Sequence, residues 1–258
     1  MKNANDSQIV LSLKDLTIGY DNKIIMENIN LDVRRGEIIS ILGQSGCGKS
    51  TLLKNIIGLY TPLEGSILIF GRDLICCSEY RRRVMMKKMG ITYQSGALLG
   101  SLSIAENVAL PLEEHTRKTE SEIKRIVMEK LEMVGMDKYA DYMPSEISGG
   151  MKKRAGLARA LALNPELLFF DEPSAGLDPI SSAEFDSLIK SIRDRANATV
   201  VLVTHELDSI FAISDRVVVL DKTIKTVADI GDPRELRENS ASEFVRRLLG
   251  RNNLKRQE

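Results

Sequence analysis

The sequence predicts an α/β fold built on a mainly parallel β-sheet, with a helical subdomain inserted into it. Two observations lead to this prediction. Short, almost wholly apolar segments at residues 37–43, 167–170 and 199–203 are typical of strands covered on both faces. Amphipathic segments of helical period alternate with these strands, which indicates strand–helix–strand units and therefore a parallel sheet.

The first part of the chain reads mainly as strands. Residues 9–20 alternate between apolar and polar side chains, as a half-buried strand does. Further strands are expected at residues 28–34, 37–43 and 66–70, with a helix from about Ser50 to Gly58.

The region from about Arg72 to Asn164 is mainly helical in pattern. Within it, the sequence from Thr119 to Glu122 is a capping box that opens a helix. Apolar side chains then recur at helical spacing, namely Ile123, Ile126, Val127, Leu131 and Val134. We therefore expect a helical subdomain here.

The α/β pattern returns at residue 167. The strand at 167–170 is followed by a helix with Phe185, Leu188, Ile189 and Ile192 on one face. Strands at 199–203 and 216–220 flank a short helix, and the tail from Ser242 is expected to be helical and to fray beyond Gly250.

Composition narrows the class of protein. The 258 residues suit one domain, or one domain with a smaller subdomain. Lys plus Arg and Asp plus Glu both number 36, and this balance argues against a nucleic-acid partner, since such proteins usually carry a basic excess. The three cysteines form no metal-binding spacing and fit a reducing cytoplasm.

Membrane insertion is not expected from this sequence. It has no apolar run near the ~20 residues that cross a bilayer, and its first residues lack the apolar core of a signal peptide. If the protein works at a membrane, it is expected to do so by binding another protein.

A glycine-rich segment predicts a phosphate-binding loop. Residues 43–51 read GQSGCGKST, which fits G-x-x-x-x-G-K-[ST] and lies between an apolar strand and a helix. Backbone N–H groups and the helix N-terminus would hold phosphate oxygens, Lys49 would supply a cation, and Ser50 a hydroxyl for Mg²⁺. The binding residues expected here are Gly43, Gln44, Ser45, Gly46, Cys47, Gly48, Lys49, Ser50 and Thr51. The alternative is a glycine-rich turn without a ligand.

Polar side chains also stand at the ends of two later strands. Asp171 and Glu172 follow the strand at 167–170, and His205 follows the strand at 199–203. Asp171 would help to hold Mg²⁺, Glu172 would accept a proton from the attacking water, and His205 would contact the γ-phosphate. A solvated acid pair and a structural histidine are the alternative interpretations.

The segment ISGGMKKRAGLARAL, residues 147–161, resembles the signature motif of ABC (ATP-binding cassette) ATPases. Ser148, Gly149 and Gly150 match that motif, whereas Met151 stands where most members carry Gln and Ile147 where most carry Leu. Other family features are similar in the same order. They are Tyr20 for the aromatic residue that stacks on adenine, Gln94 for the Q-loop glutamine, and SAGLDP at 174–179 for the D-loop with Asp178 as its acid.

The resemblance implies an ATP-hydrolysing P-loop NTPase with an additional antiparallel β subdomain. Residues 9–93 and 165–240 would form the α/β core, 94–164 the helical subdomain, and 241–258 a C-terminal helix and tail. ATP and Mg²⁺ are the implied cofactors. Lys49, Glu172 and His205 would be catalytic, and Ser50, Gln94 and Asp171 would hold the metal.

The resemblance also implies partners. In this family the signature motif closes over ATP held by a second subunit, so two copies would associate head to tail, with integral membrane permease subunits beside them. Residues 94–115 together with SGGMKKR and residues 167–180 look like the ATPases of Mla and Mce-type lipid transporters. That likeness implies phospholipid transport at the cytoplasmic face of a bacterial inner membrane, with a Mce-domain substrate-binding protein and a small regulatory subunit as further partners.

Several alternatives stay open at this point. An amino-acid importer or a lipoprotein-release system would share the common motifs. A soluble ABC protein acting on DNA or ribosomes is disfavoured because the chain has one cassette, no long heptad run and no net charge. A metabolic kinase would not need the SGG and SAGLD segments, and a module that only binds ATP would not need both Glu172 and His205.

Two surface features allow two interpretations each. The basic cluster, formed by Arg81, Arg82, Arg83, Lys87 and Lys88, is either a solvated helix face or a contact for lipid headgroups. The C-terminal helix with Phe244 and Leu248 either packs on the core or binds a neighbouring subunit.

Overall fold

The structure, a computed structural model, describes residues 9–20 and 23–250 and divides into two units. The first unit holds the described residues up to Met85 and those from Thr199 to Gly250, and the second runs from Met86 to Ala198. The helical subdomain expected at 94–164 falls inside the second unit, and its status as a separate subdomain stays a prediction.

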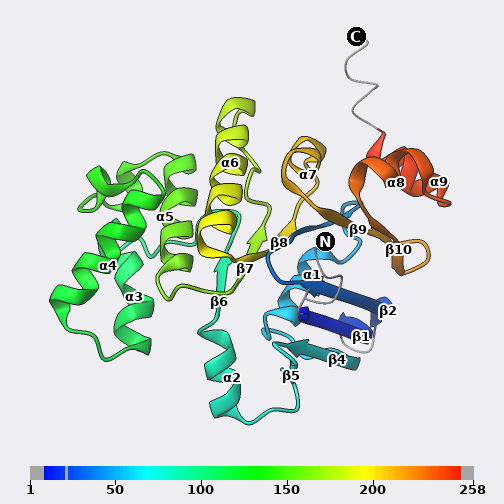
Figure 1. Ribbon diagram of the computed structural model, residues 1–258, viewed down its shortest axis with the longest axis horizontal. Coiled ribbons are helices and arrows are strands. Elements are labelled where there is room, and N and C mark those ends of the chain that lie inside the picture. Colours follow the sequence, from blue (N-terminus) through cyan, green and yellow to red (C-terminus); the bar gives the residue numbers. More distant parts are fainter. Residues whose placement is uncertain (1–8, 21–22, 251–258) are drawn as a thin grey trace, which may run out of the picture. The chain divides into compact units, whose positions relative to one another are not determined.

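An antiparallel sheet occupies the N-terminal part of the first unit (Figure 1). Its strand order is β2-β1-β4-β5, with β1 Ile9–Tyr20, β2 Lys23–Arg34, β4 Glu64–Ile69 and β5 Arg72–Asp73. The antiparallel component of the predicted fold is thus present. Strand β2 begins at Lys23 rather than at residue 28. Asn28, with φ of 51°, lies among polar residues and interrupts the apolar alternation that would have revealed the first half of the strand.

Parallel strands form the second sheet of this unit. Strand β3 (Ile38–Gly43) pairs in parallel with β8 (Thr199–Val203) on one side and with β9 (Arg216–Asp221) on the other. All side chains of β3 and β8 are buried, as their apolar sequences predicted. The carboxyl ends of these strands therefore meet at one edge, where helix α1 (Lys49–Ile56) follows β3 and helix α7 (Leu207–Ile213) follows β8.

The C-terminal part of the first unit contains elements that the sequence did not predict. Strand β10 (Thr226–Gly231) pairs antiparallel with β9, and helix α8 (Pro233–Asn239) follows it. The sequence TVADIG hides this strand because every side chain is only half buried and the apolar pattern is weak.

Helix α9 (Glu243–Leu249) begins after the N-cap Ser242, as expected. Figure 1 shows α8 and α9 side by side near β10. The buried side chains of α9, Val245, Leu248 and Leu249, join a core cluster with Leu42 and Val219, and Phe244 packs against it. This packing favours the core interpretation of the C-terminal helix. The basic tail expected to fray lies outside the described residues.

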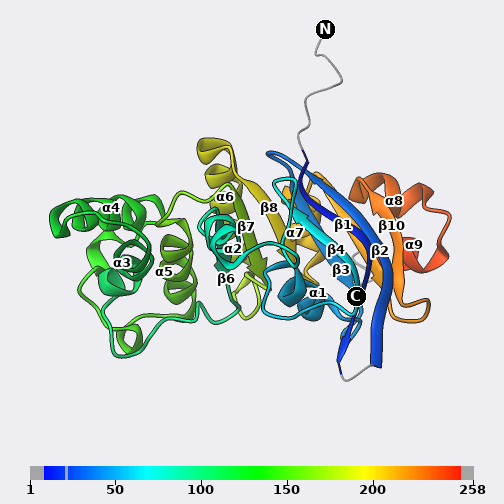
Figure 2. The ribbon, with the colours of Figure 1, turned by 90° about the horizontal axis from the view of Figure 1, so that it is seen from below.

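The second unit combines a parallel strand pair with helices, of which α3 (Ile104–His115), α4 (Glu120–Met133) and α5 (Gly149–Leu161) gather together in Figure 2. Strand β6 (Met89–Thr92) pairs in parallel with β7 (Leu167–Asp171). Helix α6 (Pro179–Ala196) also belongs to this unit, and short 3-10 turns lie at Asp137–Tyr139 and Pro144–Glu146. The predicted capping box is present, because the Thr119 side chain accepts from the N–H of Glu122 and the Glu122 carboxylate accepts from the N–H of Thr119.

The expectation of a mainly helical stretch from Arg72 to Asn164 was wrong in two places. Strand β5 lies at its start, and β6 lies within it. Strand β6 has only the four residues MGIT and carries no alternation long enough to reveal a strand. Helix α2 (Glu79–Met86) separates the two strands.

Four members of the basic cluster are bound to this chain's own atoms. Arg82 donates to the carbonyl of Gly58, and Arg83 pairs with Glu79 on α2. Lys87 donates to the His115 carbonyl at 2.9 Å, and Lys88 pairs with Glu166 at 2.6 Å. These contacts within the chain argue against the lipid-headgroup interpretation, and only Arg81, Arg82 and Arg83 of the cluster lie on helix α2. Among the helices of residues 9–20 and 23–250, none has the length and hydropathy to cross a bilayer.

A buried asparagine fixes the loop that precedes α3. The Asn107 amide oxygen accepts from the Leu99 N–H at 2.8 Å, and its NH₂ donates to the carbonyls of Leu99, Leu102 and Ser103 at 3.1, 3.1 and 2.9 Å. Replacing Asn107 by Leu removes these hydrogen bonds, and we expect the free energy of unfolding to fall by about 1–3 kcal/mol.

Urea denaturation measures this loss as a shift of the midpoint. The matched control is Asn239→Leu, because Asn239 is exposed at the end of α8 and its replacement should change stability by less than about 0.5 kcal/mol. Equal stability of Asn107→Leu and wild type would contradict the assigned role of this side chain.

Candidate functional site

The predicted phosphate-binding loop connects β3 to α1 in the first unit. Gly46 and Gly48 have φ of 75° and 102°, in the left-handed region that favours glycine. Gly43 is restricted by space instead, since an added Cβ would lie 2.5 Å from the Cys47 Sγ and 2.9 Å from the Leu220 carbonyl oxygen. The structure thus shows why the loop needs glycine at Gly43 and Gly48, the two glycines that the motif requires before its lysine, and Gly46 is a further glycine with positive φ.

Helix α1 offers a favourable site for an anion at its start. Its N-cap is Gly48, no side chain caps it, and its first turn holds no acidic residue. The first N–H groups of the helix and its dipole can therefore serve a phosphate. Ser50 and Thr51 lie in this first turn, as the motif requires.

The side chain of Lys49 folds back over the loop. Its ammonium donates to the carbonyls of Gly43 and Gln44 at 2.9 and 3.3 Å. The neighbouring Cys47 is buried, and burial raises the pKa of its thiol, although the charge of Lys49 opposes this shift. Cys47 thus acts as a neutral spacer, and its N–H donates to the Gln44 carbonyl at 3.2 Å.

Tyr20 lies beside the end of this loop. Its hydroxyl is 3.0 Å from the Thr51 Oγ1, and its side chain is 43% exposed at the end of β1. A second aromatic ring, Tyr60, meets Tyr20 edge to face with centroids 5.4 Å apart, and the Lys54 ammonium lies 5.4 Å from the centre of that ring. Tyr60 was not among the residues predicted from the sequence, because it lies beyond α1 and belongs to no recognised motif.

His205 lies at the same edge of the parallel sheet as the loop. Strands β3 and β8 run in parallel register, and the N–H of Thr204 donates to the Ile41 carbonyl at 3.3 Å. The imidazole is 60% exposed and its Nε2 is 3.8 Å from the Glu206 carboxylate. An exposed histidine at this edge fits a ligand contact better than a role in the core.

The second unit brings the other strand-end residues together. The parallel register of β6 and β7 pairs Thr92 with Phe170, so Gln94 and Asp171 emerge at the same edge. Glu172 follows with φ of 49°, a conformation uncommon for a residue other than glycine. Backbone strain of this kind clusters at functional positions.

The signature segment begins helix α5 in the second unit. Ser148 is the N-cap, and its hydroxyl accepts from the N–H of Met151 at 3.3 Å. Ser148 and Gly149 are exposed and Gly150 is partly exposed, so the start of the helix is accessible. The acid of the D-loop, Asp178, caps α6, and its hydrogen bonds with Ser181 hold the pKa of its carboxyl below the usual range.

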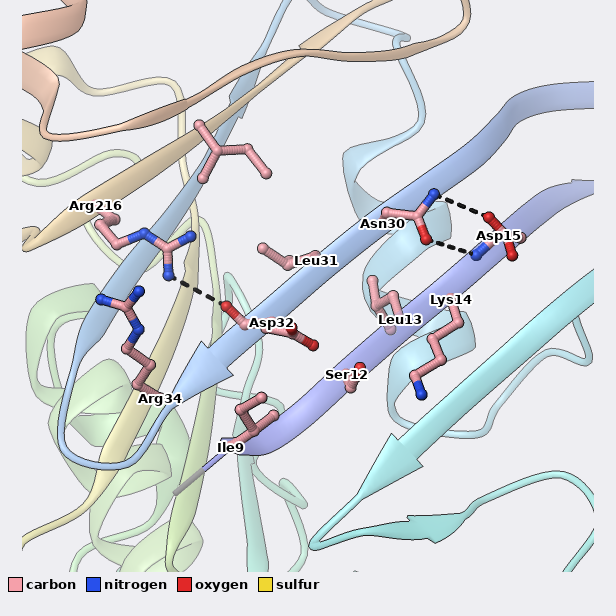
Figure 3. A pocket seen from close by; sticks show the side chains of 11 residues that line it. Ile9, Ser12, Leu13, Lys14, Asp15, Asn30, Leu31, Asp32, Arg34 and Arg216 are labelled. Atoms are coloured by element: carbon pink, nitrogen blue, oxygen red, sulfur yellow. Dashed lines mark hydrogen bonds between the residues drawn. The ribbon is translucent and has the colours of Figure 1, made fainter. Parts of the chain in front are cut away.

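A separate hollow of about 700 Å³ lies over β1 and β2 in the first unit (Figure 3). Three of its polar side chains bind other groups of this chain. Asn30 exchanges hydrogen bonds with Asp15, and Arg216 binds the Asp32 carbonyl and the Glu37 carboxylate. None of the lining residues belongs to the phosphate loop, so this hollow is not the predicted nucleotide site.

Comparison with known proteins decides the family. Residues 26–175 match the ABC transporter family. This chain belongs to the ABC transporter family. The match covers more than half of the chain, and it includes the phosphate loop, Gln94, the signature and the Asp171–Glu172 pair.

Curated relatives at similar identity carry two different transport names. The chain is 43% identical to the probable ribonucleotide transport ATP-binding protein mkl of Mycobacterium leprae, over 93% of this chain and 69% of the relative. It is 41% identical to the intermembrane phospholipid transport system ATP-binding protein MlaF of Haemophilus influenzae, over 95% of this chain and 92% of the relative.

Solved structures agree with the fold. One is the dimeric, ADP- and phosphate-bound post-hydrolysis state of the ATP-binding cassette MJ0796, with TM-score 0.78 and 30% identity over 86% of this chain and 98% of that one. Another is cbiO1 from Clostridium perfringens, with TM-score 0.83 and 28% identity over 97% of this chain and 100% of that one. The chain is therefore an ATP-binding, ATP-hydrolysing subunit of an ABC transporter, as predicted.

Proposed function

We propose that this subunit powers phospholipid transport between bacterial membranes. The observation that supports this most is the likeness to MlaF of Haemophilus influenzae, which extends over nearly the full length of both chains. The mkl relatives, which are named for ribonucleotide transport, are as similar in identity but extend well beyond the matched region. Ribonucleotide transport is therefore the second candidate, ranked below phospholipid transport because those relatives match over a smaller share of their length.

We assign the steps of ATP hydrolysis to individual residues. Lys49 and the α1 N-terminus bind the phosphates, Glu172 accepts the proton of the attacking water, and His205 contacts the γ-phosphate. Tyr20 stacks on the adenine, and its exposure beside Thr51 supports this role.

The residues assigned to Mg²⁺ fit that ion. Ser50, Gln94 and Asp171 all offer oxygen atoms, which Mg²⁺ prefers, and this ion often takes few protein ligands beside substrate phosphates. When bound, Mg²⁺ would neutralise phosphate charge. Within the second unit, Gln94 and Asp171 support this assignment because both follow the carboxyl ends of the paired strands β6 and β7.

Two copies of the chain complete the site, in our proposal, because the signature of one copy closes over ATP on the loop of the other. The exposed start of α5 supports this, since its N–H groups and dipole suit an anion. The partners we propose beyond the second copy are permease subunits, a Mce-domain protein and a small regulatory subunit. We propose that the subunit is located at the cytoplasmic face of the inner membrane.

Replacing Ser148 by Arg tests the shared site. The bulky cation at the start of α5 should block closure, so we expect ATP hydrolysis to fall by at least about a hundredfold, the order of losing a preorganised donor to a transition-state anion. Binding of a fluorescent ATP analogue to the isolated chain should stay unchanged.

The matched control is Ser103→Arg, which removes a comparable N-cap from α3 in the same unit. This control should lose only the stability of one cap, about 1 kcal/mol, and keep hydrolysis. Full hydrolysis by Ser148→Arg would refute the shared site.

The substrate is tested by purifying the tagged chain from its own membranes in mild detergent, followed by mass spectrometry of proteins and small molecules. A permease with a Mce-domain protein and phospholipid is the expected result. Ribonucleotides or an amino-acid- or lipoprotein-binding partner would keep the ATPase and overturn the phospholipid proposal. Recovery without any permease would contradict a transport role.

A further inference from the structure

A lysine inside the signature helix binds the segment that follows the proposed catalytic carboxylate. Lys153 lies on α5, close to the exposed N-terminus of that helix, yet its own relative exposure is only 8%. Its ammonium donates to the carbonyls of Pro173 and Ala175, both at 2.6 Å. Such short, charge-assisted hydrogen bonds are among the stronger ones in proteins.

The two carbonyls belong to a tight turn that begins at Glu172. The N–H of Ala175 donates to the Glu172 carbonyl at 3.3 Å, and Glu172 itself has a positive φ. A residue held in this sparsely populated conformation needs support from its surroundings. Lys153 supplies such support, because one side chain fixes the carbonyl of the next residue and that of the residue three positions on.

The charge of Glu172 also acts on Lys153. Burial lowers the pKa of the Lys153 ammonium, while the nearby charge of Glu172 opposes that shift. Lys153 is thus a buried cation that feels the charge of the Glu172 carboxylate. A buried cation of this kind is costly unless it is well paired, and its two short hydrogen bonds supply that pairing.

Further contacts of α5 lead to the same stretch of chain. A Cβ added at Gly150 would lie 3.5 Å from a Leu177 methyl group, and Arg154 pairs with Glu184 on α6 at 3.1 Å. Of the two charged residues Lys153 and Arg154, only Lys153 is buried, and its side chain is the one that binds the turn next to Glu172.

We propose that Lys153 is a positioning residue for ATP hydrolysis, which holds the Glu172 turn to the signature helix and so couples the signature motif to the proposed catalytic base of the same chain. This inference rests on the proposed role of Glu172 as the base. If α5 moved when its N-terminus bound a phosphate, the movement would be transmitted to Glu172 through the Lys153 ammonium and the Pro173 and Ala175 carbonyls. The signature helix would thus have a second role, which is to position the Glu172 carboxylate of its own chain.

Lys153→Met in the full-length chain tests the proposal, because methionine matches the length of lysine without its charge or donors. We expect kcat for ATP to fall by about ten- to a hundredfold, as misplacement by about 1 Å can cost. The KM for ATP should change less than about twofold, since the phosphate loop is untouched. Lys153→Arg, which keeps charge and donors, should recover most of the loss, and Lys190→Met on the exposed face of α6 should retain wild-type kcat.

A double-mutant cycle with Glu172→Gln separates positioning from a general loss of structure. If Lys153 acts through Glu172, single-turnover hydrolysis by the double variant should equal that of Glu172→Gln alone within about twofold. Two outcomes would overturn the positioning role of Lys153 and leave the role of Glu172 intact. In one, the losses of the two single variants multiply in the double variant. In the other, Lys153→Met keeps the wild-type kcat while Glu172→Gln is inactive. Near wild-type turnover by Glu172→Gln would overturn the assignment of the base, and this proposal with it.

Discussion

Glu172→Gln is expected to bind ATP normally and to hydrolyse it about 10²–10⁴-fold more slowly than the wild type, the range that general acid–base assistance contributes. Glutamine keeps the shape of the side chain but cannot accept the proton of the attacking water. Timed assays of phosphate release measure the rate of hydrolysis, and ATP binding measured in parallel gives the affinity.

The structure offers a matched control for this substitution at the other end of the same strand. Glu166 precedes β7 and pairs with Lys88 at 2.6 Å, so Glu166→Gln removes a comparable acid away from the strand's carboxyl end. It should lose little stability, since partly exposed ion pairs contribute about 0–1 kcal/mol, and should keep its turnover. Turnover of Glu172→Gln near that of Glu166→Gln would show that another group is the base.

Lys49→Ala is expected to weaken ATP binding by about 10- to 150-fold and to abolish measurable hydrolysis at ordinary ATP concentrations. The estimate converts the roughly 1.5–3 kcal/mol of a hydrogen bond to a charged group into affinity. The ammonium now lies over the loop on the Gly43 and Gln44 carbonyls, from which it can turn toward a phosphate.

Isothermal titration of ATP into each variant measures this loss. Lys14→Ala is the control, because Lys14 is an exposed lysine of the same unit that lines the separate hollow in Figure 3. Equal affinity of Lys49→Ala and Lys14→Ala would exclude the loop as the phosphate site.

The sequence predicted the fold where its physical signals were strong. The fully apolar strands β3 and β8 and the capping box at Thr119 were found where expected, because burial on both faces and reciprocal capping leave clear patterns. The short β6 and the half-buried β10 were missed, since tertiary contacts rather than periodicity define them.

In the candidate site too, some features could be predicted from the sequence and others could not. The phosphate loop could be predicted because its chemistry requires glycine and lysine at fixed spacing. Two contacts could not be predicted, the edge-to-face ring of Tyr60 on Tyr20 and the Lys153 hydrogen bonds to Pro173 and Ala175. A side chain that binds backbone carbonyls twenty residues away leaves no mark in a sequence, whatever its importance.

The claim that two copies share each site is tested most directly by mixing two inactive variants. In a mixed pair of Lys49→Ala and Ser148→Arg, the intact loop of one copy faces the intact signature of the other, so one complete site forms. Equimolar mixing should restore hydrolysis to at most about a quarter of wild type, because random pairing makes half the dimers mixed and each has one intact site of two. If the mixture stayed as inactive as its components, the account of a shared site would be contradicted.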